Sequence, residues 1–437
     1  MNILIKNIKG LVQTEDEPRP LVAGTDMQSA PVLQNAWLLI KNGLIEDYGE
    51  MDTCPSVIAK KIDAGGCYVF PSFVDSHTHM VYARSREAEF EKRIQGMSQE
   101  EIEAEGGGIC RSADLLRETS EEELFQKSKV RLERVIQTGT GAMEIKSGYG
   151  LGLESELKIL RVIRRLRDAS PIPIKATFMG AHAVPMSYRH HREDYIKLLL
   201  EDMLPRIAEE GLADYIDAFC DRGFFTPEET DQILQAGISY GLEPKLHTNE
   251  LCSSGGVCIG CNRSALSMDG LVHVTQDELQ QLRETASIAT LLPGPSFFAN
   301  LEFPDARSLI DGGLPVALAS DYNPGTAPSG NLCFIFSLAC IKLGMTVEEA
   351  LNALTLNGAA AIRMQDTLGS IARGKVANVF ITAPIPSMAY LPYSFGNNLI
   401  ETIILNGKIV EPGKATEIKP HHVRDKSKAK RIERQED

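Results

Sequence analysis

Between Gly65 and Gly369, short apolar runs alternate with stretches of helical periodicity, and no other feature limits the possible folds of this chain as strongly. Eight of these runs predict β-strands, over residues 69–79, 142–147, 174–179, 215–220, 244–248, 269–274, 287–292 and 316–321. Helical stretches lie between most of them. Eight strand–helix units in roughly 300 residues favour an α/β fold of the TIM-type (β/α)8 barrel over a doubly wound sheet.

Four of the helical stretches begin with a capping signal. Ser or Thr is followed three residues later by Glu at Ser120/Glu123, Thr226/Glu229, Thr275/Glu278 and Thr346/Glu349. In a capping box, the two side chains accept hydrogen bonds from backbone N–H groups that the first helical turn leaves unpaired. These four sites therefore predict helix N-termini.

Both ends of the chain have the pattern of β structure. Asn42-Gly43 lies between two apolar runs, which is typical of a two-residue hairpin turn, and Asn406-Gly407 repeats the signal near the other end. We expect a small, sandwich-like β domain built from residues 1–66 and 369–420, beside a catalytic barrel of residues 67–368. Residues 421–437 mix charges of both signs without an apolar face, so we expect a disordered tail in which His421 and His422 are solvated.

Composition argues against several classes of function. The formal net charge of −14 argues against nucleic acid as a partner, because an acidic surface repels phosphates. Apolar runs fall short of the roughly 20 residues that cross a bilayer, and residues 1–20 lack the pattern of a signal peptide. The nine cysteines are odd in number and scattered, which predicts no disulfide framework and favours the cytoplasm. Cys258 and Cys261 form a lone Cys-x-x-Cys that cannot by itself complete a four-ligand zinc site, and we interpret it as structural.

A metal site is indicated at the strand ends. His77 and His79 end the first predicted barrel strand, and residues two apart on a strand point to the same face. By itself, the pair is also compatible with two polar strand-end histidines. His247 ends the fifth predicted strand and Asp321 the eighth, at the barrel end where such folds keep their catalytic residues. Three imidazoles and one carboxylate suit one zinc or iron ion.

Such an ion would lower the pKa of its water to about 7 and supply hydroxide at neutral pH. We expect Asp321 to take the proton of this water and to deliver it to a leaving nitrogen. Glu250, three residues beyond His247, is a candidate to orient the water or to assist the proton transfer, although it can also be an ordinary loop carboxylate.

The first-strand motif at 70–79 resembles that of the amidohydrolase superfamily, and segments along nearly the whole chain resemble the imidazolonepropionase family within it. These segments are 85–90, 106–109, 144–151, 180–185, 246–250, 291–294 and 321–326. The run around Tyr149 and the Asp-x-Asn-Pro-Gly run that begins at Asp321 are specific to this family, whereas His-x-His is not.

The resemblance implies a homodimeric hydrolase that opens the ring of 4-imidazolone-5-propanoate to N-formimidoyl-L-glutamate in histidine degradation, with one zinc or iron ion. It implies metal ligands at His77, His79, His247 and Asp321. It implies substrate contacts at Arg86, Tyr149, His182, Glu250, Asn323, Gly325 and Thr326. Arg86 suits this substrate, because a planar guanidinium binds a carboxylate such as propionate at two points. The plainer interpretations are an ion pair of Arg86 with Glu87 or Glu89, packing for Tyr149 and a structural role for His182.

Two positions depart from the family pattern. The pattern has a histidine directly after Asp269, where this chain has Gly270, so His273 becomes the candidate for that catalytic role. The pattern also often has a tyrosine where Gln99 stands. These departures allow a reduced activity or an altered substrate.

Two alternative functions are left open. The first is a hydrolase or deaminase that acts on another small cyclic amide or amidine, since a fold does not fix the substrate. The second is a non-catalytic barrel that serves as a binding or assembly module. Arg86, Tyr149 and Asn323 argue against the first, and the full set of candidate metal ligands argues against the second.

Overall fold

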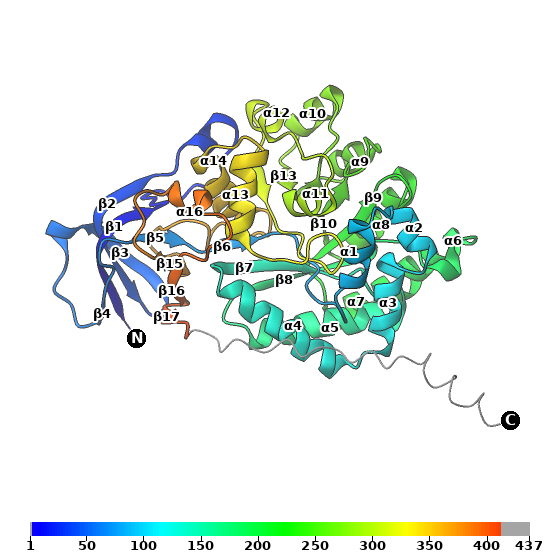
Figure 1. The fold of residues 1–437 in the computed structure, drawn as a ribbon, viewed down its shortest axis with the longest axis horizontal. Coiled ribbons are helices and arrows are strands. Elements are labelled where there is room, and N and C mark those ends of the chain that lie inside the picture. Colours follow the sequence, from blue (N-terminus) through cyan, green and yellow to red (C-terminus); the bar gives the residue numbers. More distant parts are fainter. Residues whose placement is uncertain (1, 412–437) are drawn as a thin grey trace.

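The computed structural model describes residues 2–411, except for the side chains of residues 99 and 100. The expectations for Gln99 and for the tail at 421–437 therefore lie outside the described residues. Within the described part, the chain forms a barrel surrounded by helices and a second sheet at one side of the barrel (Figure 1).

Eight parallel strands follow one another around the described barrel. They are β6 (Phe73–Asp75), β7 (Thr140–Lys146), β8 (Ile174–Ala181), β9 (Tyr215–Cys220), β11 (Leu246–Thr248), β12 (Ser267–Gly270), β13 (Ile288–Leu291) and β14 (Val316–Leu318), with the short β10 (Glu243–Pro244) beside β9. Just beyond β6 and β14, Thr78 pairs with Tyr322 in parallel, and the N–H of His79 donates to the carbonyl of Tyr322 over 2.9 Å. These contacts join the first and last strands, and the predicted (β/α)8 barrel is confirmed.

The first predicted strand, 69–79, is wrong in its extent. The chain changes partners at Ser72, whose N–H bonds to Asn378 O, while the next N–H, that of Phe73, bonds to Gly139 O in the barrel. The run therefore splits into β5 (Tyr68–Pro71), which belongs to the second sheet, and β6, which belongs to the barrel. His77 and His79 lie just past the end of β6 rather than within a strand.

Helices cover the outside of the barrel and connect its strands. They are α1 (Glu87–Ile94), α2 (Gln99–Ala104), α3 (Gly108–Glu118), α4 (Glu121–Ile136), α5 (Leu153–Ala169), α6 (Arg192–Lys197), η4 (Leu198–Met203), α7 (Leu204–Glu210), α8 (Pro227–Ser239), α9 (Gly256–Asn262), α10 (Gln276–Arg283), α11 (Pro293–Ala299), α12 (Ala306–Asp311), α13 (Leu332–Lys342), α14 (Val347–Leu354) and α15 (Leu356–Ala360). Short helical turns lie at η1 (Gly24–Gln28), η2 (Met51–Thr53), η3 (Met186–Tyr188) and α16 (Tyr390–Tyr393).

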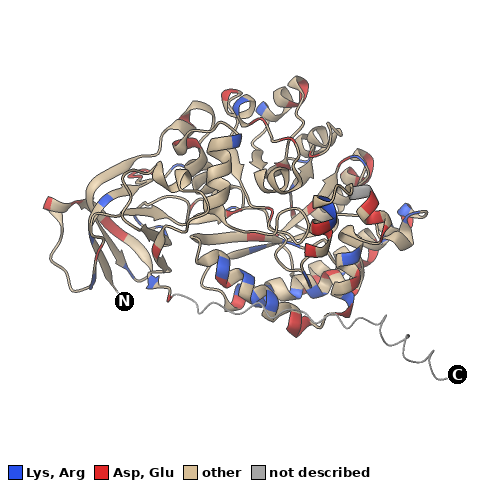
Figure 2. Cartoon of the chain, viewed as in Figure 1, with Lys and Arg blue, Asp and Glu red and all other residues tan. Residues whose placement is uncertain are grey.

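The four predicted helix starts are confirmed. Complete capping boxes open α8 at Thr226, α10 at Thr275 and α14 at Thr346, and the Ser120 side chain caps α4 by accepting the N–H of Glu123. Figure 2 shows acidic and basic residues mixed along α4 and α5 on the outside of the barrel. The apolar faces of these helices instead join the large core between helices and strands.

The second sheet is built from both ends of the chain, as the sequence predicts. Its strand order is β17, β16, β15, β5, β1, β2, β3, with β4 also paired to β1. The strands not yet placed are β1 (Ile3–Val12), β2 (Val32–Lys41), β3 (Leu44–Glu50), β4 (Lys60–Asp63), β15 (Val379–Thr382), β16 (Ile400–Leu405) and β17 (Lys408–Ile409).

Both predicted hairpin turns of this sheet are confirmed. Asn42 and Gly43 have φ of 54° and 87°, and Asn406 and Gly407 have φ of 50° and 65°. Positive φ at both central residues is typical of the tight turn whose twist matches a hairpin. The sheet also curls on itself, because the N–H of Ile45 bonds to Lys375 O over 2.8 Å just ahead of β15. The curl encloses a separate apolar core.

Candidate metal centre and active site

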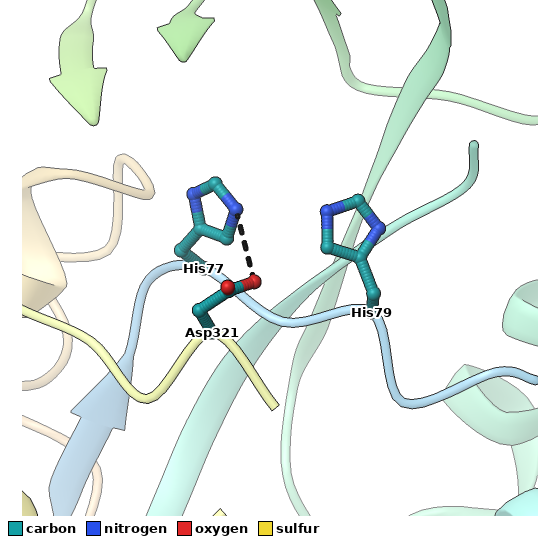
Figure 3. A group of neighbouring side chains, drawn as sticks. All are labelled: His77, His79 and Asp321. Atoms are coloured by element: carbon teal, nitrogen blue, oxygen red, sulfur yellow. Dashed lines mark ion pairs between the residues drawn. The ribbon is translucent and has the colours of Figure 1, made fainter. Parts of the chain in front are cut away.

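Three buried side chains converge at the closing seam of the barrel. His77 and His79 follow β6, Asp321 follows β14, and their ligand atoms all lie within 4.8 Å of one another. His77 Nε2 is 3.6 Å from Asp321 Oδ1, as the dashed line in Figure 3 marks. Two imidazoles and a carboxylate at this spacing can surround one divalent cation.

The second nitrogen of each histidine is already engaged. His77 Nδ1 lies 2.7 Å from Asp269 Oδ2, and His79 Nδ1 lies 2.8 Å from Ser147 O. Each Nδ1 thus carries the proton, which leaves Nε2 with its lone pair available for a metal. His77 Nε2 is buried and has no hydrogen-bond partner among the described residues. An unpaired buried nitrogen is costly, and a cation at the centre of the cluster would remove that cost.

Asp321 is held in an unusual backbone conformation. Its φ is 48°, and its N–H donates to His77 O over 3.0 Å. The preceding residue, Ser320, donates through N and Oγ to the two carboxylate oxygens of Asp75, over 3.0 and 2.6 Å. Asn323 Nδ2 donates to Asp321 Oδ2 over 2.8 Å. Burial raises the pKa of Asp321 to about 8 in the absence of a cation, and a bound cation would oppose this shift.

His247 lies beside the cluster but not within it. Its ring is 5.0 Å from that of His77, centre to centre, while its Nε2 lies 2.7 Å from Glu250 Oε2 and its Nδ1 is buried without a partner. Burial opposes protonation, but the hydrogen bond that His247 donates to the Glu250 carboxylate outweighs it and raises the pKa of His247 to about 9. To ligate an ion through Nε2, His247 would have to exchange Glu250 for the metal, so its role as a fourth ligand stays a prediction.

Tyr149 and His182 form a wall next to His79. The His182 ring stacks on His79 at 4.8 Å with an interplanar angle of 13°, and the Tyr149 ring meets both imidazoles edge-on. His182 Nδ1 lies 3.1 Å from Gly148 O, so this nitrogen carries the proton. Burial lowers the pKa of His182 to about 3 and raises that of Tyr149 above its usual value. Both side chains are therefore neutral at pH 7.

Arg86 is a buried guanidinium with unused hydrogen-bond donors. It is 8% exposed, and its Nε lies 3.4 Å from Glu89 Oε2. Neither Nε nor Nη1 makes a hydrogen bond within the described chain. The ion pair of Arg86 with Glu89 exists, but it is buried, so the interpretation of Arg86 as a surface residue is wrong. Two free N–H directions in a buried cation are suited to a bound carboxylate.

The loop after Asp321 shapes this region. Asn323 Oδ1 accepts the N–H groups of Gly325 and Thr326, both at 2.8 Å, so its polar atoms are engaged inside the loop. A Cβ on Gly325 would overlap the Arg86 guanidinium. Glycine at this position therefore provides the space in which Arg86 lies.

This close approach leads to a prediction. In Gly325→Ala, the added methyl group must displace the Arg86 guanidinium, so we expect substrate KM to rise by about tenfold, the effect of losing roughly one charge-assisted hydrogen bond. Gly152→Ala is the matched control, because only one atom lies near its Cβ position, at 4.0 Å. Steady-state kinetics of both variants provide the check. Equal KM values would show that Arg86 does not depend on this space.

Gly270 lines a cavity and leaves no room for a side chain at its own position. Its φ is 102°, and a Cβ there would lie 2.9 Å from Thr248 O and 3.2 Å from His247 Cδ2. The cavity measures about 310 Å³, and both Glu250 and His273 line it. His273 is fixed through its backbone, which bonds to Asn249 at 2.9 Å (N–H to O) and 2.8 Å (O to Nδ2). The structure thus places His273 beside a cavity that Gly270 and Glu250 also line.

Sequence reasoning missed the side chains that support these groups. Asp269 and Asp75 contact a candidate ligand or its neighbour through their side chains, and Ser147 contacts His79 through its backbone carbonyl. Further charged residues fill the inside of the barrel. One signal was present in the sequence. Lys245 stands two residues before His247, and therefore on the same, inward face of its strand.

The barrel, with a buried histidine–carboxylate cluster at its strand ends, defines a class of metal-dependent hydrolases. Residues 68–410 match the model of the amidohydrolase family, to which the chain therefore belongs. Guanine deaminase from E. coli is similar in structure, with a TM-score of 0.68 and 15% identity over 95% of this chain and 100% of that one. An adenosine deaminase from Xanthomonas campestris with bound zinc has a TM-score of 0.68 and 14% identity, over 93% and 92% of the two chains. These likenesses show the fold.

Sequence relatives narrow the class further. Imidazolonepropionase from Flavobacterium johnsoniae is 49% identical over 411 residues, which cover 94% of this chain and 100% of the relative. Imidazolonepropionase from Clostridium tetani is 40% identical over 413 residues, 94% of this chain and 98% of the relative. The chain is a member of the imidazolonepropionase family, and hence an enzyme of the hydrolase class.

Proposed function

We propose that this enzyme hydrolyses the cyclic amide of 4-imidazolone-5-propanoate to give N-formimidoyl-L-glutamate in histidine degradation, with one zinc or iron ion. The observation that carries the proposal is a buried guanidinium with free donors, Arg86, in the same barrel mouth as the buried His77–His79–Asp321 cluster. A substrate with a propionate at one end and a ring carbonyl at the other suits an anion-binding group and a cation site together.

The ligands of the ion are His77, His79 and Asp321, with His247 as the proposed fourth. When bound, the ion supplies the charge that lowers the pKa of a water to about 7. Asp321 accepts the proton of that water and delivers it to the ring nitrogen that leaves, while Asn323 fixes the orientation of its carboxylate. Glu250, next to the His247 ring, orients the attacking water.

The remaining side chains bind the substrate. Arg86 pairs with the propionate, in the space that Gly325 leaves open. Neutral Tyr149 and His182 offer hydrogen bonds to the ring without competing for the cation. The Oγ1 of Thr326, which accepts from Asn323 Nδ2 over 3.0 Å, is a further proposed contact. Burial of these groups excludes water and so strengthens each polar contact with the substrate.

Loss of the imidazolone absorbance, followed with metal-replete protein, tests this proposal. We expect rapid loss that depends on enzyme concentration, and formation of N-formimidoyl-L-glutamate. The cavity that Gly270 lines favours one alternative, a hydrolase or deaminase of another small cyclic amide or amidine. Turnover of such a compound, with no loss of imidazolone propionate, would decide for that alternative.

His273 is proposed to serve in proton transfer from the cavity that it lines together with Gly270. In His273→Ala we expect kcat to fall by about 100-fold, the usual contribution of a general acid or base. The backbone contacts of residue 273 with Asn249 should survive, so the melting temperature should change little. An unchanged kcat would show that His273 has no part in the reaction.

The exposed apolar side chains and the free cysteines bear on assembly and location. We propose a homodimer, supported by large apolar side chains exposed on α11, α13 and α16, among them Phe297 (50%), Ile341 (61%) and Tyr393 (75%). All nine cysteines are free, which supports a reducing cytoplasm. Of the helices in residues 2–411, none is long and apolar enough to cross a membrane. Sedimentation analysis measures the assembly directly.

A further inference from the structure

Charged side chains fill the inside of the barrel beneath the metal cluster. Each of five is at most 1% exposed: Glu144, Lys146, Asp217, Lys245 and Asp269. Buried charges are costly unless they are paired, and here each lies within an ion pair. None of the proposed reaction steps uses them.

Lys146 stands at the centre of this network. Its Nζ lies 2.6 Å from Glu144 Oε1, 2.7 Å from Asp217 Oδ2 and 3.5 Å from Asp269 Oδ2. Burial lowers the pKa of Lys146, but the surrounding carboxylates outweigh burial and raise it well above the usual range. The side chain is therefore a permanent cation with three carboxylates around it.

Two of these carboxylates reach the candidate ligands. Asp269 Oδ2 accepts the hydrogen bond from His77 Nδ1 at 2.7 Å, and so aims that ring. Asp217 Oδ1 accepts the backbone N–H of His247 at 2.9 Å, and so holds the strand that carries that residue. One ammonium group thus fixes two carboxylates that hold two different histidines.

Lys245 belongs to the same network but has different partners. It pairs with Glu144 and donates to the carbonyls of Ser76 and Ala361, each at 3.2 Å. Within the described residues, Lys245 forms no ion pair with Asp217 or Asp269, although its charge lowers the pKa of Asp269. The two lysines therefore match in burial and share one carboxylate, while only Lys146 contacts the aspartates that hold the histidines.

We propose that Lys146 is a positioning residue of the metal site, which holds Asp217 and Asp269 in place and thereby orients the His77 ring toward the ion and fixes the strand that carries His247. The inference rests on the proposed metal-dependent function. Partners of metal ligands commonly change metal affinity by about 10–100-fold when they are removed. An effect of this size is expected from Lys146 although it touches neither the ion nor the substrate.

The test compares Zn²⁺ affinity of the wild type, Lys146→Met and Lys245→Met by competition with a chromophoric chelator, together with thermal unfolding of the metal-free proteins. Both variants should unfold at lower temperature, because each leaves Glu144 with one cation fewer. Lys146→Met should bind zinc about 10–100-fold more weakly. Lys245→Met keeps the ion pairs to both aspartates and should weaken zinc binding by a clearly smaller factor. Equal weakening in both, or no weakening in Lys146→Met, overturns the proposal.

Asp269→Asn provides a second route if Lys146→Met does not fold. It preserves volume but removes the charge between Lys146 and His77, so the proposal again requires weaker zinc binding, and an unchanged affinity overturns it. A wild-type protein that binds neither zinc nor iron contradicts the proposed function itself. Equal zinc affinities across folded variants contradict only the role of Lys146.

Discussion

Asp321→Asn should lower kcat by about 10³-fold or more while the protein stays folded. The asparagine has the same shape but cannot accept the proton of the attacking water, and general bases contribute about 10²–10⁴-fold in rate. It also removes one negative charge from the cluster with His77 and His79, so metal content should be measured beside kcat. The combined loss makes this the largest effect that we expect from any single substitution.

The fold of this variant should be preserved, because its supporting contacts do not need a charge. The backbone N–H still donates to His77 O, and the Asn323 amide can donate to the new carbonyl oxygen as it does to Asp321 Oδ2. A melting temperature near that of the wild type, with metal supplied in excess, is the control. Near-normal turnover under those conditions would refute the role of Asp321 as the base.

Arg86→Ala should raise KM by roughly 10–100-fold with a smaller change in kcat. The guanidinium is buried and has two nitrogens without hydrogen bonds, and hydrogen bonds to charged groups contribute about 1.5–3 kcal/mol each. A loss confined to KM indicates binding energy that the ground state and the transition state share. Arg86→Lys should restore part of the affinity, since lysine keeps the charge but not the two-point geometry.

The matched control for this substitution is Arg84→Ala. Arg84 is exposed and stands only two residues away. Its substitution therefore removes the same charge from the same segment without changing the proposed pocket. An unchanged KM in Arg86→Ala would remove Arg86 from the substrate site. An equal rise in KM for Arg84→Ala would show that the effect is a general charge effect.

The barrel and the core of the site could be predicted because both depend on local periodicity. The eight apolar runs locate the strands, and the spacing of His77 and His79 places both rings on one side of an extended segment. Asp321 can be predicted because it is the polar residue that ends the eighth apolar run, 316–321. The closing of the barrel then brings these residues together through the pairing of Thr78 with Tyr322.

The side chains that support the site could not be predicted in the same way. Asp269 and Lys146 are charged residues within buried strands, and their partners are far away in the sequence, so their pairing appears only once the barrel has closed. The pairing of Glu250 with His247 depends on Asn249, whose φ of 56° turns the chain back. Asparagine tolerates this left-handed conformation, but the carboxylate that it brings back to the imidazole is set by the folded chain. The nearness of Gly325 to Arg86 likewise requires the folded chain.

Elemental analysis of the metal content is the most direct test, because the proposed reaction requires one cation held by residues from opposite ends of the barrel sequence. Purified wild-type protein should contain one equivalent of zinc or iron per chain, and the His77→Ala/His79→Ala variant should contain none while still folding. A catalytically active wild type without metal, or a double variant that retains a full equivalent, would contradict the account.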